Sequence, residues 1–471
     1  GVWTGSVSVG GGVTGATLTA TSGAVAGTSA AFDVQGAASS SPPTARFTAS
    51  PVVIHVNETV SFDASASSDY QTPAALLQVS WDFLGTSTAA PAYPTPAAPW
   101  TAWTTTKAAA NTYSTAGTYV VRLAVRDSAG DMGYATVTVV VLPAGGSLCT
   151  VTTAADVDDG ATSCAGPYGT DGKLSLPEAI RLVPAGGTIT FSGAMTITGS
   201  GSYSLAKAMT ILAPAGVILD TKSLNVTAAV TVSGLEIAHQ PLGVPITVGA
   251  AGNLTLADAY LHDFSGLSDQ GTLTLTGTRV AACTADCVRS GGGARIVARY
   301  GEFRDSPGIA GIAFDSCTSA ATLNVYATVF ARMGTGIRLN CALTAAVQNN
   351  TFVANATGVD YRADGLTLQN NNFTGHTTTA VNCVFSNFNN SGYHLLYQNA
   401  SNGCIASDGG TLLVDPLYVF PSASDYRLQP TSPAVDTGQT GLGLYLVPAF
   451  PAAPGPQFLG AGPDRGGRET Y

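Results

Sequence analysis

The chain has 471 residues, enough for two to four domains. Only 10% of the residues are charged, the formal charge is −10, and no lysine follows Lys222, so the chain lacks the basic stripe of a nucleic-acid-binding protein. No uninterrupted apolar stretch is long enough for a membrane span, and the Gly, Ala, Thr and Ser content favours sheet over exposed helix.

Residues 1–36 alternate apolar and polar side chains in three short runs broken by glycine, which predicts strands. Three strands cannot bury both faces of a sheet, and this segment resembles the C-terminal strands of a bacterial immunoglobulin-like (Ig-like) module. We therefore expect a partial Ig-like β-sandwich at 1–36 and a flexible linker at 37–44. Either the chain is a processed part of a longer precursor, or another chain completes the sandwich.

The next segment, residues 45–143, ends in two alternating stretches around "DSAGD" (residues 127–131), which predicts a β-hairpin. The segment resembles the PKD domain, a β-sandwich of extracellular multidomain proteins. The matching positions are Trp81, Asp82, Phe83, Tyr113, Gly117, Tyr119 and Asp127. The family usually continues "WDF" with a Gly-Asp-Gly turn, whereas a long Pro- and Ala-rich loop stands here.

The last segment, residues 147–471, repeats itself. Gln348, Asn350 and Phe352 recur 21 residues later as Gln369, Asn371 and Phe373. Apolar residues in similar contexts occur earlier, at Ile237, Tyr260, Val280, Phe303 and Phe330, in steps of 20 to 27 residues. Such periods predict stacked repeats, and the strand-like pieces within each repeat favour strands over the helical half of leucine-rich repeats.

We therefore predict an all-β protein whose main body is a right-handed parallel β-helix of roughly ten coils about 4.8 Å apart. The seven apolar residues from Ile237 to Phe373 are expected to form one interior stack. Asn350 is expected to lie directly beside Asn371, because side-chain amides at strand spacing form hydrogen-bonded ladders.

Both ends of this segment resemble those of bacterial β-helices. Residues 149–180 resemble the CSLREA-type segment that precedes such helices, with Ser175, Leu176, Glu178 and Ala179 matching, although Leu174 and Pro177 stand where that family has Cys and Arg. This implies a capping helix near 174–183. Residues 415–471 resemble the closing segment of the same group.

The eight cysteines fit the repeat. Cys317 and Cys341 are 24 residues apart and Cys383 and Cys404 are 21 apart, close to one coil. The remaining cysteines, Cys149 with Cys164 and Cys283 with Cys287, would close shorter loops. Spacing does not fix the pairing, but an even count matched to the repeat indicates disulfides and an extracellular, secreted protein. Any signal peptide is then expected to have been removed, since no basic segment opens the chain.

Candidate catalytic side chains are few: Arg299, Arg304, Asp305, Asp315 and Arg332. Asp305 and Arg332 each follow an apolar anchor by two residues, and Arg279 and Glu302 each precede one by one residue. We interpret these as surface ion pairs between coils. His239 and His262 are predicted to share a register, but no third ligand accompanies them, so we expect no metal and no cofactor.

These observations favour a secreted surface or matrix protein that forms a rigid, disulfide-stapled rod. Its expected partners are further copies of itself, added head to tail through residues 1–36 to form a filament, and a surface polysaccharide. The alternative is a carbohydrate-active β-helix enzyme, a lyase or hydrolase, with an accessory PKD module. A groove lined by at least two acids and one base would favour the enzyme, whereas a flat surface of Thr, Ser and Asn would favour the structural protein.

Overall fold

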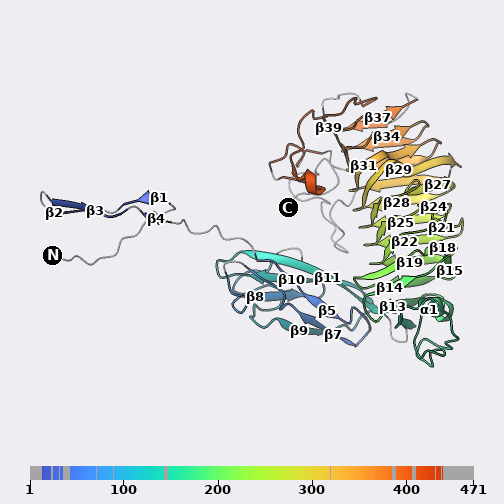
Figure 1. Ribbon diagram of the computed structural model, residues 1–471, viewed down its shortest axis with the longest axis horizontal. Coiled ribbons are helices and arrows are strands. Elements are labelled where there is room, and N and C mark those ends of the chain that lie inside the picture. The colour runs from blue at the N-terminus through green and yellow to red at the C-terminus, as the bar shows by residue number, and fades with distance from the viewer. Residues whose placement is uncertain are drawn as a thin grey trace. The chain divides into compact units, whose positions relative to one another are not determined.

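The computed structural model describes residues 13–17, 19–22, 25–30, 32–34, 43–69, 72–87, 90–142, 147–318, 320–384, 389–405, 410–429, 431–435 and 437–438. The chain divides into two compact units, Gly1–Pro143 and Ala144–Tyr471, and each is described by itself (Figure 1). Apart from one helix and one 3-10 turn, the described elements are strands, so the all-β prediction is confirmed.

The first unit contains eleven described strands. They are β1 (Val13–Ala16), β2 (Thr19–Ser22), β3 (Val25–Thr28), β4 (Phe32–Val34), β5 (Thr48–Ser50), β6 (Val53–His55), β7 (Thr59–Asp63), β8 (Gln78–Asp82), β9 (Ala108–Thr112), β10 (Gly117–Arg126) and β11 (Met132–Leu142). β1 pairs with β4 and β2 pairs with β3, whereas β6-β11-β10-β8 and β5-β7-β9 form two larger sheets. Residues 37–42 of the expected linker lie outside the described residues.

Side chains of the two larger sheets share one core. In that core the rings of Trp81 and Phe83 stack with centroids 5.8 Å apart, and the Tyr113 hydroxyl donates to the carbonyl of Phe83 at 3.1 Å. Asp82 accepts hydrogen bonds from three backbone N–H groups of the turn after β8, and Asp127 accepts two in the turn between β10 and β11. These residues therefore fix turns and core packing in this unit.

The second unit begins with strand β12 (Leu148–Val151) and helix α1 (Leu176–Leu182), which contacts it. Ser175 caps the helix, because its side chain accepts from the N–H of Glu178 while the Glu178 carboxylate accepts from the N–H of Ser175 at 3.0 Å. Leu176, Ala179 and Ile180 are buried in the same core as the first coils. The helix therefore packs onto the first coils, within the range predicted for a cap.

The rest of the unit is a solenoid of two parallel sheets (Figure 1). An eleven-stranded sheet, which we call the long sheet, contains β12, β13 (Gly187–Phe191), β16 (Met209–Leu212), β19 (Ala229–Ser233), β22 (Asn253–Ala257), β25 (Thr272–Thr276), β28 (Arg295–Arg299), β30 (Thr322–Tyr326), β32 (Thr344–Gln348), β35 (Leu366–Gln369) and β38 (Asn389–Gly392). Each strand follows its neighbour by one coil.

A seventeen-stranded sheet, the bent sheet, forms the remaining wall. It contains β14 (Met195–Thr198), β15 (Ser202–Leu205), β17 (Val217–Asp220), β18 (Ser223–Val226), β20 (Glu236–Ala238), β21 (Ile246–Val248), β23 (Tyr260–His262), β24 (Leu267–Asp269), β26 (Arg279–Ala281), β27 (Val288–Gly292), β29 (Glu302–Cys317), β31 (Val329–Leu339), β33 (Thr351–Val353), β34 (Thr357–Tyr361), β36 (Asn372–Thr374), β37 (Thr379–Cys383) and β39 (Leu395–Tyr397). The registered pairs are parallel in both sheets, so the predicted parallel β-solenoid is confirmed.

One interior column holds the rings of four phenylalanines. Phe303, Phe330, Phe352 and Phe373 are stacked at centroid distances of 5.0, 5.0 and 4.8 Å. Val280, Leu261 and Ile237 continue the column. The prediction that Tyr260 belongs to this stack is wrong, because Tyr260 pairs with Glu236 and Arg279 on the outer face. The sequence comparison matched one aromatic residue with another, but strand alternation turns the next residue, Leu261, inward.

A second column consists of buried amides. The Asn350 amide donates to Oδ1 of Asn371 at 3.1 Å, and the backbone N–H of Asn350 donates to the same oxygen at 2.9 Å. The Gln348 amide donates to Gln369 in the same way at 3.2 Å. These polar groups are paired from coil to coil, which lets them lie in the interior.

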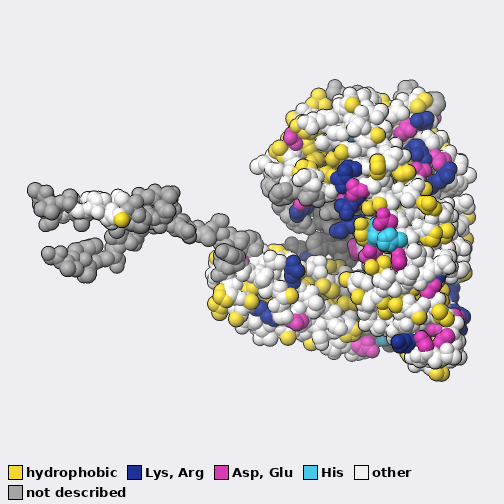
Figure 2. Space-filling model, viewed as in Figure 1, with side chains coloured by type: hydrophobic (Ala, Val, Ile, Leu, Met, Phe, Trp, Pro, Cys, Tyr) yellow, Lys and Arg dark blue, Asp and Glu magenta, His cyan; other side chains and the backbone are white. Residues whose placement is uncertain are grey.

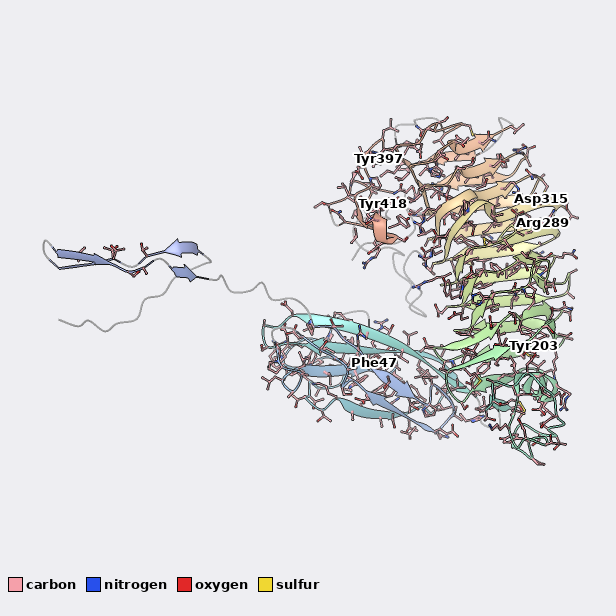
Figure 3. All side chains as sticks on the ribbon, viewed as in Figure 1. Phe47, Tyr203, Arg289, Asp315, Tyr397 and Tyr418 are labelled. Atoms are coloured by element: carbon pink, nitrogen blue, oxygen red, sulfur yellow. A yellow bond between two sulfur atoms is a disulfide. The ribbon has the colours of Figure 1, made fainter. Side chains whose placement is uncertain are left out.

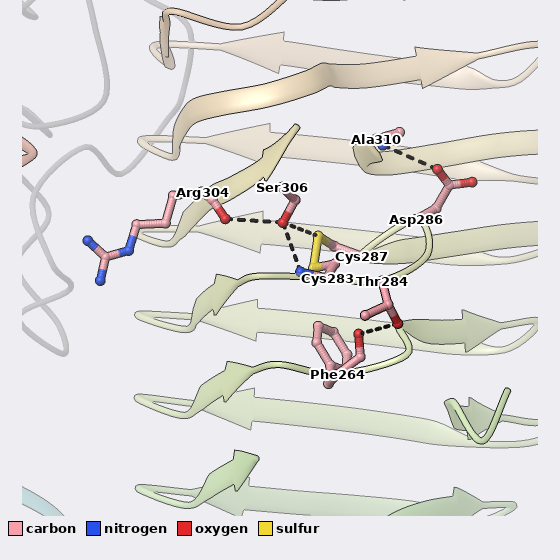
Figure 4. The surroundings of a disulfide bond; sticks show 8 residues. All are labelled: Phe264, Cys283, Thr284, Asp286, Cys287, Arg304, Ser306 and Ala310. Atoms are coloured by element: carbon pink, nitrogen blue, oxygen red, sulfur yellow. Dashed lines mark hydrogen bonds between the residues drawn. A yellow bond between two sulfur atoms is a disulfide. The ribbon is translucent and has the colours of Figure 1, made fainter. Parts of the chain in front are cut away.

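All eight cysteines are joined in disulfides. The bonded pairs are Cys149–Cys164, Cys283–Cys287, Cys317–Cys341 and Cys383–Cys404. Figure 4 shows the second pair, where the Ser306 hydroxyl accepts from the N–H of Cys283 at 2.9 Å. Disulfides, predicted from the spacing, are therefore confirmed.

The chain then folds back as an antiparallel hairpin of β40 (Tyr418–Phe420) and β41 (Asp425–Leu428), joined through a 3-10 turn (Pro421–Ala423). Tyr418, Tyr426 and Leu428 pack in one cluster with Val329, Ala331 and Val353 of the bent sheet. The hairpin therefore covers part of the outer face of that sheet. Of the predicted closing segment, residues 439–471 lie outside the described residues.

Candidate functional site

The shortest strands of the bent sheet present two outward side chains each. In β23, Leu261 points inward, whereas Tyr260 and His262 point outward. The strand lies between two corners, Asp258 and Asp263, which both have a φ of 50°. Because neighbouring coils bend at equivalent corners, their outward side chains lie beside one another.

These outward positions and corners carry a continuous row of titratable side chains that we call the charged strip. It contains Asp220, Glu236, His239, Tyr260, His262, Asp263, Arg279, Glu302, Arg304, Asp305 and Arg332. Strand register places Glu236, Tyr260, Arg279 and Glu302 next to one another in that order. Figure 2 shows the histidines among acidic side chains, with basic side chains further along the same face.

Arg332 joins the charged strip to the C-terminal hairpin. Its Nε donates to Asp305 at 2.6 Å, and its two terminal nitrogens donate to the Tyr426 hydroxyl at 2.6 Å and to the Ser424 hydroxyl at 2.9 Å. The guanidinium is therefore engaged on all of its nitrogens. We assign Arg332 to holding the hairpin in place.

An open pocket of about 340 Å³ lies between the C-terminal hairpin and the charged strip, and we call it the arginine pocket. Its lining residues are Arg279, Glu302, Arg304, Val329, Ser424, Asp425, Tyr426 and Arg427. Three of the nineteen Lys and Arg residues of the chain thus meet two carboxyl groups in one place.

The three arginines of the pocket differ in their pairing. Arg427 contacts Asp425 at 2.6 Å. Arg304 is more loosely held: its buried Nε lies 3.9 Å from Glu302 and 3.7 Å from Asp305 and has no hydrogen-bond partner within the described part of the chain. Arg279 is exposed and forms no ion pair with any described residue. Donors of Arg279 are therefore available to a ligand.

Next to the pocket, two histidines lie among three carboxylates. His262 contacts Glu236 at 2.9 Å through Nε2 and Asp263 at 2.8 Å through Nδ1, and His239 contacts Asp220 at 2.9 Å. Burial lowers the pKa of His262, but the hydrogen bonds to Asp263 and Glu236 together outweigh it, so the pKa is raised above its usual value.

The prediction that His239 and His262 share a register is wrong. His262 pairs with Ala238, and His239 occupies the following corner, a left-handed position with a φ of 49° that corresponds to Asp263. The error follows from using Tyr260 instead of Leu261 as the anchor. The two rings still approach to 5.7 Å between centroids. Among the described residues, no group of three or more His, Cys, Asp or Glu side chains could hold a metal ion.

The remaining sequence candidates lie elsewhere. Arg299 is on the long sheet, where its Nε donates to Thr276 at 3.2 Å. Asp315 lies near the far end of β29 and pairs with Arg289 at 3.0 Å, on the side of the solenoid opposite Tyr397 and Tyr418 (Figure 3). Sequence reasoning missed Asp425 and Arg427, because no periodicity signals which coil a closing hairpin will cover.

No helix in the described ranges is long and apolar enough to cross a membrane. No protein-family model matches the chain, and no curated protein matches it.

The solved structures that are similar in part include the following two. The family 28 exopolygalacturonase of Yersinia enterocolitica is 12% identical with a TM-score of 0.39, and the match covers 78% of this chain and 88% of that one. A structure of carbohydrate-binding modules of the β-sandwich superfamily, described as the basis of their promiscuous specificity, is 29% identical with a TM-score of 0.19, and the match covers 23% of this chain and 38% of that one. At these TM-scores neither likeness supports a conclusion about activity.

Proposed function

We propose that the protein is a carbohydrate-active solenoid that binds an acidic polysaccharide in the arginine pocket and cleaves it there. The observation that carries this proposal is the convergence of Arg279, Arg304 and Arg427 with Glu302 and Asp425 in one open pocket. These residues come from two coils and from a hairpin that lies more than one hundred positions further along the chain.

The arginines suit the negative groups of such a polymer. A guanidinium presents a rigid fork of N–H donors that matches a carboxylate or sulfate group. The chain as a whole carries a charge of −10, so a polyanion would be repelled from most of its surface. A local concentration of arginines would therefore select where the polymer binds.

The two carboxyl groups supply what bond cleavage requires. Glycoside hydrolysis needs one carboxyl group to protonate the leaving oxygen and a second to activate water or attack the sugar. Glu302, whose side chain is 13% exposed, and Asp425 are the acids of this pocket. A groove lined by two acids and at least one base favours an enzyme over a purely structural protein.

Binding can be tested with polygalacturonate by isothermal titration calorimetry. Arg279→Ala is expected to weaken binding at least tenfold, since a charge-assisted hydrogen bond contributes about 1.5–3 kcal/mol. Arg299→Ala is the matched control, because it removes the same charge from an exposed site on the long sheet, and less than a twofold change is expected. Equal losses in the two variants would show non-specific charge attraction and contradict the proposal.

Cleavage can be tested separately with Glu302→Gln, which keeps the shape of the side chain. New reducing ends without an unsaturated product would indicate hydrolysis, and a product absorbing in the ultraviolet would indicate a lyase. The variant is expected to lose turnover while its affinity for polygalacturonate changes little. A wild-type protein that binds acidic polymers and cleaves none of them would restrict the function to binding.

A structural role is the second candidate, and a specific observation favours it: interior Phe and Asn columns and the disulfides Cys317–Cys341 and Cys383–Cys404 connect neighbouring coils, which makes the solenoid stiff. Under this proposal residues 45–143 are a PKD-type module, residues 1–36 a partial Ig-like module that joins copies into a filament, and the solenoid a CSLREA-associated surface rod. The disulfides support an extracellular location in both cases. Electron microscopy of the native assembly tests it, since isolated monomers would exclude the filament.

A further inference from the structure

A lysine and an aspartate form a buried ion pair in an earlier coil than the arginine pocket. Lys222 lies at the corner between β17 and β18, and Asp156 lies in the segment between β12 and α1. Nζ of Lys222 is 2.5 Å from Oδ2 of Asp156, and the two side chains are 8% and 16% exposed. In the ion pairs of the described residues, no other basic side chain is as buried as that of Lys222.

The two carboxyl oxygens of Asp156 have different partners. Oδ2 faces the amine of Lys222, whereas Oδ1 accepts a hydrogen bond from the hydroxyl of Tyr203 in β15, which lies near the N-terminal end of the solenoid (Figure 3). Tyr203 is buried, and its ring centroid is 4.6 Å from Nζ of Lys222. The amine also donates to the carbonyl of Ser200 at 2.8 Å. The nitrogen is therefore held against the carboxyl group and screened from water by the aromatic ring.

A glycine leaves room for this pair. A Cβ added to Gly199 would overlap Oδ2 of Asp156 and would lie 2.6 Å from Cε of Lys222. A larger residue at position 199 would push the two reactive groups apart. The backbone of the preceding corner is therefore shaped to let the amine and the carboxyl group meet inside the protein.

We propose that Lys222 and Asp156 condense to form an intramolecular isopeptide bond between Nζ and Cγ. Two charges are costly to keep out of water, so a proton moves from Nζ to Oδ2 and leaves a neutral amine beside a neutral acid. Nζ then attacks Cγ, and the negative charge that develops is carried by Oδ1.

The hydrogen bond from Tyr203 is directed at the oxygen that becomes negative. A fixed donor at this position stabilises the tetrahedral intermediate, as an oxyanion hole does. A second proton passes from the nitrogen to Oδ2, the bond between Cγ and Oδ2 breaks, and one water molecule leaves. An ammonium and a carboxylate are thereby converted to an amide and water, and no oxidant, reductant or cofactor is consumed.

Close placement favours the amide over the separated groups. Two groups held in contact by a folded protein can react as if each were present at about 10⁵–10⁸ M, provided that their geometry is close to that of the reaction. Few water molecules reach the site to reverse the reaction, because both side chains and Tyr203 are buried.

The bond would fix the start of the solenoid. Residues 152–175, between β12 and α1, contain no strand or helix, and the disulfide Cys149–Cys164 joins part of this segment to β12. The isopeptide bond would join the same segment to the corner before β18. It would restrict the unfolded chain as a disulfide does, but reducing agents would not break it. The cross-link does not depend on the arginine pocket.

The test is mass spectrometry of the full chain after reduction and denaturation, which open the disulfides and separate ion pairs. The wild-type mass is expected to be lower than the mass calculated from the sequence by one water molecule. Lys222→Arg keeps the positive charge but removes the amine, so it should have the full calculated mass. Lys207→Arg is the matched control, because the Lys207 amine donates to the carbonyl of Arg181, and this variant should still lose one water molecule.

Peptide mapping locates the bond. Trypsin is expected not to cut after Lys222, and the peptide that contains Lys222 should be recovered joined to the one that contains Asp156. Tyr203→Phe removes the donor to Oδ1, so the cross-link is expected to form at least tenfold more slowly. A Tyr203→Phe variant that cross-links as fast as the wild type would contradict the part given to Tyr203.

Two results would overturn the inference. One is a wild-type chain that has the full calculated mass and is cut normally after Lys222, because the two side chains would then form an ion pair and nothing more. The other is a loss of water that persists in Lys222→Arg, because the water would then come from another site. Circular dichroism shows whether each variant is folded, so that a missing bond can be assigned to the side chain that was changed.

Discussion

Interior positions are filled differently in two regions of the solenoid, the coils from Phe303 to Phe373 and the coil from Leu261 to Val280. In the former, two interior columns repeat the residue type of the coil before, with Phe on Phe and Asn on Asn. In the latter, only two residues join β24 to β25, against four between β21 and β22, and Asp269 pairs with Val248 of the preceding coil, so a carboxyl group replaces an aliphatic side chain. Positions that follow the repeat are explained by packing, so positions that break it are where another requirement must be sought.

The regular region is shaped by pairs of large and small residues. A Cβ added to Gly311, Gly336 or Gly358 would lie 2.7–2.9 Å from the ring of Phe330, Phe352 or Phe373, respectively. Each ring therefore occupies space that a glycine leaves free. This explains why the phenylalanines stack without tilting, with interplanar angles of 7–9°.

Breaking the regular region should have the largest effect. Phe352 is fully buried and stacks on a ring at either side, so Phe352→Ala is expected to lower the free energy of unfolding by about 3–5 kcal/mol. Phe352→Leu, which keeps most of the volume, should cost clearly less. Urea denaturation measures both, and a Phe352→Leu variant as stable as the wild type would show that ring stacking is unimportant here.

Removing the carboxyl group of Asp269 should instead raise the free energy of unfolding. Because the pKa of Asp269 is raised to about 6, its ionisation favours the unfolded chain above that pH and has no effect below the unfolded pKa near 4. The stability of Asp269→Asn relative to the wild type is therefore expected to improve by about 3 kcal/mol between pH 4 and pH 8.

Urea denaturation across that pH range measures the difference, with Asp364→Asn as a control that should show little change. A pH-independent difference would mean that the carboxyl group is not destabilised by burial. It would also remove the argument that this acid is retained at a cost to stability.

Much of the fold could be predicted because similar residues recur at a regular spacing along the chain. Residue type and spacing predict the interior column of Phe330, Phe352 and Phe373. In the same way, the one-coil spacing of cysteines predicts disulfides between neighbouring coils. The prediction that Tyr260 lies in the interior stack was wrong because a shift of one residue along a strand exchanges its inward and outward side chains. Residue type alone did not show which of Tyr260 and Leu261 points inward. The arginine pocket could not be predicted for another reason. Asp425 and Arg427 line it because the C-terminal hairpin packs against the bent sheet, and the repeat period does not determine where that hairpin packs.

A smaller effect is expected when the glycine partner of a ring is changed. Gly336→Ala forces a methyl group against the Phe352 ring and the carbonyl of Gly358, and we expect a loss of about 1–3 kcal/mol. Gly193→Ala is the matched control, because nothing lies within 4 Å of its Cβ position, and it should change stability little. If both variants unfold at the same urea concentration, the glycine and phenylalanine columns do not depend on each other.

The smallest effect is expected at His262, on the outside of the irregular coil. Its pKa is raised in the folded protein, so the protonated form stabilises the fold below the unfolded pKa near 6.5, and this contribution disappears as the pH rises through the folded value. His262→Gln should therefore be destabilised by less than about 1 kcal/mol at pH 5, since Glu236 and Asp263 remain partly solvated, and by less still at pH 9. Thermal unfolding at the two pH values measures the change, and added salt should reduce it at pH 5. A deficit that grows with pH would instead mean that the neutral imidazole is the stabilising form, and that the acids beside it act through hydrogen bonds alone.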